Sequence, residues 1–123
     1  MKYPFKIDLT QKPEGYVEAL EVWLQETPVQ AMCELDVPKK RMFMNMLAWF
    51  KRYSSVEVNR VCAMILNPVL DKDAMTFSGE LVSYGPKGDV VEKMNGLVRL
   101  SARMLRGTAS REVVKIYSFD VIQ

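Results

Sequence analysis

The sequence predicts an α+β fold in which four to five helices pack with a small, mainly antiparallel sheet. Two kinds of pattern support this class. Several stretches carry apolar residues at intervals of three and four, as on one face of a helix, whereas others alternate or are rich in β-branched and aromatic residues. The strands are expected near residues 2–9, 75–84 and 112–122. A chain of 123 residues is long enough for a core of its own, so residues 1–123 are expected to form a single globular domain.

The first two elements are a strand and a helix. Residues 2–9 alternate, and Pro4 suits a strand at the edge of a sheet. From Tyr16 to Glu26 the apolar residues fall on one side of a helix. That buried side consists of Tyr16, Ala19, Leu20, Trp23 and Leu24.

Two further helices are expected in the next 27 residues. Thr27 and Pro28 have the residue types of an N-cap and a first helical position, which predicts a short helix that ends near Leu35. Residues 39–53 carry a wide apolar surface, which predicts the central helix of the fold.

Residues 56–66 allow two interpretations. Ser54 and Glu57 have the spacing of a capping box, and the apolar residues that follow have helical spacing, which favours a helix. A buried strand is the alternative, because the residues around Glu57 also alternate.

The stretch L-V-R-L-S-A-R-M-L-R-G (97–107) poses the same choice. As a strand it alternates apolar and polar residues, but Leu97 and Leu105 would then point outward with the arginines. As a helix it begins at Asp89, which has Glu92 three positions later, and it ends at Gly107. The helix is therefore predicted. It places three arginines on a face turned away from the core, namely Arg99, Arg103 and Arg106.

Composition excludes several classes of function. Seventeen basic and fifteen acidic residues give a net charge of +2, too little for a histone-like nucleic-acid binder. The chain has no histidine, so the commonest general base and the commonest nitrogen ligand of zinc are both missing. We therefore expect neither an enzyme, nor a cofactor, nor a metal site. Asp71 and Asp73 are interpreted as solvated surface residues.

The expected compartment is the cytoplasm. The N-terminus lacks the apolar run of a signal peptide, since Asp8 interrupts it, and no membrane contact is expected. Cys33 and Cys62 form no C-x-x-C pair and are expected to be buried thiols, although a disulfide between them stays open.

The sequence thus predicts a small non-enzymatic binding protein, a regulator, adaptor or inhibitor that acts through protein–protein contacts. The contact surfaces are expected on the methionine-rich helix 39–53 and on the arginine face, because methionine and aromatic side chains suit a protein partner. Acidic and basic helix faces in one chain also leave a homodimer open. The candidate partner-binding residues are Arg99, Arg103, Arg106, Met44, Trp49 and Phe50.

The alternative function is nucleic-acid binding. Residues 28–47 have the pattern of a helix-turn-helix, in which the N-terminal residues of the second helix enter the major groove. Lys39, Lys40 and Arg41 would occupy those positions. Asp36 stands where glycine is usual in the turn, which weakens the match.

Overall fold

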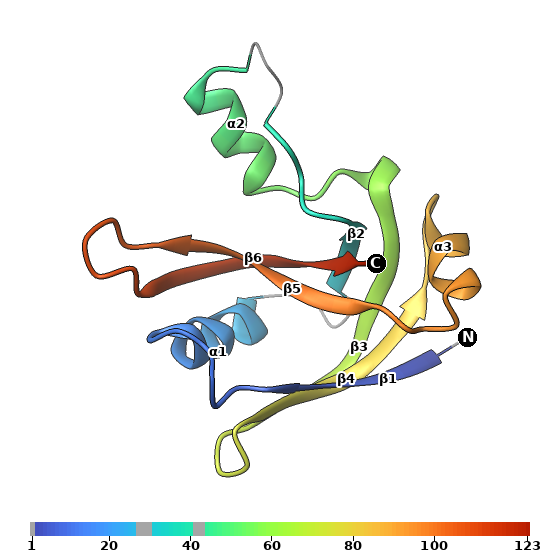
Figure 1. Cartoon of the computed structure of the whole chain (residues 1–123), viewed down its shortest axis with the longest axis horizontal. Helices are drawn as coiled ribbons and strands as arrows, with labels where there is room; N and C mark the ends of the chain where they lie inside the picture. The colour runs from blue at the N-terminus through green and yellow to red at the C-terminus, as the bar shows by residue number, and fades with distance from the viewer. Residues whose placement is uncertain (1, 27–30, 41–43) are drawn as a thin grey trace.

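A curled six-stranded sheet forms the body of the molecule (Figure 1). This computed structural model describes residues 2–26, 31–40 and 44–123. The strand order is β1-β4-β3-β2-β6-β5, and neighbours run antiparallel except β2 and β6, which are parallel. The strands are β1 (Lys2–Asp8), β2 (Ala31–Leu35), β3 (Val61–Asp71), β4 (Thr76–Ser83), β5 (Arg99–Arg106) and β6 (Val113–Ile122).

Short helices connect the strands in the described part of the chain. They are α1 (Tyr16–Glu26), α2 (Met46–Tyr53), α3 (Gly88–Lys93) and the 3₁₀ turn η1 (Val58–Arg60). The predicted class, four to five helices on a small sheet, is therefore wrong. The three predicted strands are confirmed as β1, β4 and β6, but three segments predicted as helix contain the other three strands.

The core lies between α1 and the sheet. The Trp23 ring stands edge-on to Phe119 and Phe77, with ring centroids 5.1 and 6.4 Å apart. Leu20 is completely buried on the same side of α1. The helix predicted over residues 16–26 and its buried side are thus confirmed, although Leu24 is only partly buried.

The helix predicted to end near Leu35 is wrong over residues 31–35. This segment is β2, which pairs with β3 on one side and β6 on the other. Residues 27–30, which carry the capping pattern, lie outside the described residues. The pairing of a central strand with two neighbours outweighs a helical signal that precedes the strand.

Residues 56–66 follow the strand alternative from Val61 onward. Only η1 has helical character, and the chain then enters β3. Val61, Cys62 and Ala63 are all buried, although successive residues of a strand point to opposite faces. A strand covered on both faces loses its alternating pattern, which is why apolar spacing alone could not identify it.

The long helix predicted from Asp89 to Gly107 is also wrong. It is divided into α3 and β5 at Asn95 and Gly96, whose φ angles are +55° and +75°. The Gly96 N–H donates to the carbonyl of Val91, so Gly96 ends the helix instead of standing inside it. The three arginines consequently lie on a strand.

The predicted helix 39–53 is shorter than expected. α2 begins after Asn45, whose side chain accepts a hydrogen bond of 2.8 Å from the Ala48 N–H. None of the residues of α2 is buried, so the prediction of a central helix is wrong. None of the helices in the described ranges is both long and apolar enough to cross a membrane.

Candidate functional site

The candidate site is on α2, which projects beyond the sheet (Figure 1). Met46, Leu47 and Phe50 are 72%, 64% and 49% exposed. Met46 and Leu47 precede Phe50 by four and three positions, so both are neighbours of Phe50 and the three side chains form one apolar surface. We call these three residues the α2 patch.

The C-terminal part of α2 is attached to β5 and β6. The Tyr53 hydroxyl donates to the carbonyl of Met104 at 3.1 Å and accepts from its N–H at 3.3 Å. The Tyr53 and Phe50 rings both stand edge-on to Tyr117, with centroids 6.0 and 6.3 Å away. Trp49 is half-buried against Tyr53. The C-terminal end of the helix is therefore fixed, while Met46 and Leu47 in its first turn remain largely in water.

Beneath the C-terminal end of α2 lies a buried ionic network centred on Arg103. This side chain is 1% exposed. Its Nε and Nη2 donate to Asp120 at 3.1 and 2.5 Å, and Nη2 also donates to Glu34 at 2.9 Å. Its Nη1 donates to the backbone carbonyls of Tyr53 and Ser55 at 3.1 and 2.7 Å. All five N–H groups of the guanidinium thus have acceptors.

Glu34 is the second centre of the network. Arg52 donates to its two oxygens at 2.5 and 3.1 Å, and the backbone N–H of Glu57 donates at 3.0 Å. The Arg60 Nε lies 3.8 Å from the same carboxylate. Burial alone would raise the pKa of Glu34, but the hydrogen bonds from Arg52, Glu57 and Arg103 lower it below its ordinary value.

Asp120 behaves differently from Glu34. Burial raises its pKa, and the bonds from Arg103 offset only part of that effect. Burial would also lower the pKa of Arg103, but its bonds to the two carboxylates raise it. The alternation of β6 explains the placement: Asp120 lies between Phe119 and Val121, which belong to the core, so its carboxylate faces the opposite side of the sheet.

The network is suited to anchoring and offers no reactive group. Three arginines face three acids, so the charges balance, and the carboxylates of Glu34 and Asp120 are occupied by donors. It fixes the chain from α2 to η1 against the outer face of β2, β5 and β6. The six residues are Glu34, Arg52, Glu57, Arg60, Arg103 and Asp120.

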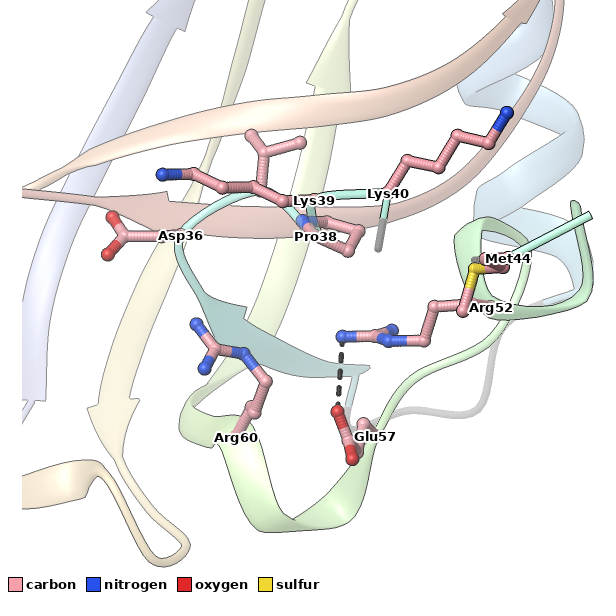
Figure 2. Close-up of a pocket in the computed structure, with 9 residues that line it drawn as sticks. Asp36, Pro38, Lys39, Lys40, Met44, Arg52, Glu57 and Arg60 are labelled. Carbon is pink, nitrogen blue, oxygen red and sulfur yellow. Dashed lines mark ion pairs between the residues drawn. The ribbon is translucent and has the colours of Figure 1, made fainter. Parts of the chain in front are cut away.

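A cavity of about 540 Å³ lies beside this ionic network (Figure 2). Lys39 and Lys40 extend from the loop in opposite directions, and Arg52 points to Glu57. Arg60 is also engaged, since it donates to the carbonyl of Leu35 at 2.5 Å. The cations therefore do not converge on a single point. The lining residues are Asp36, Val37, Pro38, Lys39, Lys40, Met44, Arg52, Glu57 and Arg60.

The predicted arginine face does not exist as one surface. Arg99 and Arg106 are exposed at the two ends of β5, and Arg106 donates to the carbonyl of Arg111. Arg103 is buried between them on the side of the sheet that Asp120 faces, so the prediction of one arginine face directed away from the protein interior is wrong.

The predicted residues around α2 do lie near one another. Trp49 and Phe50 belong to the helix itself, and Met44 lies in the cavity wall just before it. Lys39 and Lys40 line the same cavity, whereas Arg41 lies outside the described residues.

The helix-turn-helix prediction for residues 28–47 is wrong in its geometry. Its first helix is replaced by β2 over Ala31–Leu35, and α2 begins only at Met46. Lys39 and Lys40 therefore do not open a helix.

The acids of the network were not predicted from the sequence. Glu34 stands in A-M-C-E-L (31–35) and Asp120 in F-D-V-I (119–122), each a single charge within an apolar segment. A lone charge in a buried strand requires a partner, because an unpaired buried charge is costly. This signal could have indicated that one of the arginines turns inward.

Comparisons of the chain with protein-family models, with curated proteins and with solved structures found no match. Among the residues that the structure describes, no group of three or more cysteine, aspartate or glutamate side chains is arranged to hold a metal ion.

Proposed function

We propose that the protein is a non-enzymatic binding protein, a regulator, adaptor or inhibitor, and that the α2 patch is its contact surface for another protein. The observation that carries the proposal is the exposure of Met46, Leu47 and Phe50 on a helix whose C-terminal end is firmly attached. An apolar surface of this kind on a fixed element is typical of protein interaction sites.

The buried ionic network explains how α2 would bind a partner efficiently. A helix that must form on binding loses conformational entropy, whereas a preformed helix avoids that cost. Arg103 holds the backbone of Tyr53 and Ser55, and Arg52 holds Glu34, so the end of the helix is in place before any partner arrives. The expected mode is a helix laid into an apolar groove of the partner.

The charges near α2 indicate which kind of residue surrounds that groove on the partner. Lys39, Lys40 and Lys51 are exposed, and none of them makes an ion pair within the described ranges. A partner with acidic residues around an apolar groove would complement these lysines, which would favour fast and selective association. We place the protein in the cytoplasm, because Cys33 and Cys62 are both buried and free.

Affinity capture with matched variants tests the proposal. The tagged protein, its Leu47→Glu variant and its Val114→Glu variant are each incubated with a lysate of the source cells. Val114 is the control, because it is 59% exposed on β6, close to the 64% of Leu47. We expect a bound protein to be retained by the wild type and by Val114→Glu, and to be reduced about tenfold by Leu47→Glu, since a charge is then buried in the groove.

Two outcomes would contradict the proposal. Equal capture by all three proteins would place the contact elsewhere. Capture that depends on nucleic acid, removed by nuclease and weakened by Lys39→Ala with Lys40→Ala, would favour the nucleic-acid alternative instead.

A further inference from the structure

The curled sheet leaves a slot between its two edge strands, β1 and β5. A cavity of about 410 Å³ lies there. At one end the Tyr3 ring lies against the backbone of Gly96, where an added Cβ would be 2.3 Å from a ring carbon. The slot is lined by Pro4–Asp8, Lys12, Leu81, Gly96 and Val98–Leu100.

Both edges have unused hydrogen-bonding capacity. In the described chain, β1 pairs with β4 and β5 pairs with β6, and no backbone hydrogen bond joins β1 to β5. β1 contains Pro4, which has no N–H to offer, whereas β5 has neither proline nor glycine in its eight residues. β5 is therefore the better template for an added strand.

The side chains of the slot combine an apolar floor with a basic rim. Phe5, Ile7 and Leu100 are partly buried and pack against the core. Lys6 and Arg99 are exposed and make no ion pair among the described residues. The one acid of the lining, Asp8, already accepts two hydrogen bonds from Thr10.

We propose that this slot binds an extended peptide segment with acidic side chains, which adds to the sheet as a strand beside β5. Its backbone would pair with the edge of β5 near Arg99 and Leu100, away from Met104, whose N–H and carbonyl are bonded to Tyr53. Alternate side chains would point to the apolar floor. Its carboxylates would meet Lys6, Lys12 and Arg99, which are the cations of the lining. The proposal is independent of the α2 patch, because no residue of α2 lines the slot.

Fluorescence anisotropy with defined peptides tests the inference. The probe is a labelled hexapeptide of alternating glutamate and valine. One comparison peptide has lysine in place of glutamate, and another keeps the glutamates but has alternate backbone amides N-methylated. We expect the first peptide to bind, and the other two to bind at least about tenfold more weakly, because one loses charge complementarity and the other loses its hydrogen-bond donors.

Charge-reversal variants locate the site. Arg99→Glu should weaken binding of the glutamate peptide at least about tenfold. Lys87→Glu makes the same change of charge at an exposed residue outside the slot, and should leave binding unchanged. Circular dichroism of both variants verifies that the fold is kept.

Several results would overturn the inference. These are no binding at millimolar peptide, equal binding of the glutamate and lysine peptides, or equal loss in the Arg99 and Lys87 variants. Equal binding of the N-methylated peptide, together with displacement by decanoate, would assign the slot to a small amphipathic anion instead of a strand.

Discussion

Replacement of Arg103 by methionine is expected to remove a large part of the stability of the fold. The guanidinium makes hydrogen bonds to two buried carboxylates and two backbone carbonyls. Methionine fills a similar space without donors, so Asp120 loses both of its bonds from this side chain and Glu34 loses one of its donors. Breaking a buried ion pair by removing one partner costs about 3–5 kcal/mol. Domains of this size are stable by only about 5–15 kcal/mol.

The free energy of unfolding can be measured by urea denaturation, with tryptophan fluorescence as the signal. If the free energy falls by about 1.5 kcal/mol per molar urea, the midpoint of Arg103→Met should fall by about 2–3 M. Arg106→Met is the matched control, because Arg106 is exposed on the same strand. It should change the free energy by less than about 0.5 kcal/mol. Equal, small losses in the two variants would refute the assignment of Arg103 as the buried centre of the network.

Three more predictions concern the buried thiols, the loss of stability at acidic pH and the attachment of α2. Burial raises the pKa of Cys62 to about 12 and also raises the pKa of Cys33, so a thiol reagent at pH 8 should label neither in the folded protein and both in guanidinium; rapid labelling of the native protein would contradict this. Although burial alone would raise it, the pKa of Glu34 is lowered from 4.5 by its donors, so the unfolded state takes up the proton first as pH falls. This contribution to stability is present above about pH 4.5 and is lost at lower pH. As the pH is lowered, the urea midpoint of Glu34→Gln should therefore decline less steeply than that of the wild type. The same pH dependence in both proteins would refute this prediction. Tyr53→Phe leaves the N–H and carbonyl of Met104 without their partner and should cost about 1–2 kcal/mol in the same urea assay, whereas wild-type stability would show that the bond contributes little.

Elements with a one-sided pattern could be predicted from the sequence. α1 buries the side expected from its apolar spacing, and β1, β4 and β6 lie where strand-forming residues are concentrated. These segments are identified by local sequence because one face is apolar and the other is polar, or because β-branched residues dominate.

The remaining strands depend on contacts that local sequence does not contain. β2 and β3 lie in the middle of the sheet and are covered on both sides, so their apolar residues do not alternate. In β5, Arg103 is a buried charge in a segment that mixes apolar and basic residues. Only its pairing with Glu34 and Asp120 makes its burial favourable. A charge at the protein surface and a charge satisfied inside the protein look alike in a single sequence.

The candidate site was predicted in part for the same reason. The residue types of α2 indicated a contact surface, and Phe50 does lie in the α2 patch. Met46 and Leu47 were assigned to a buried central helix instead, because exposure depends on how α2 is attached to β5 and β6.

The most direct test of the proposed contact is site-specific photo-crosslinking in the source cells. A photoreactive amino acid is placed at position 47 in one variant and at position 114 in a second, since Leu47 and Val114 are similarly exposed on different elements. We expect one other protein to be crosslinked reproducibly from position 47 and not from position 114. The same products from both positions, a crosslink only to a second copy of the chain, or none from position 47 would contradict it.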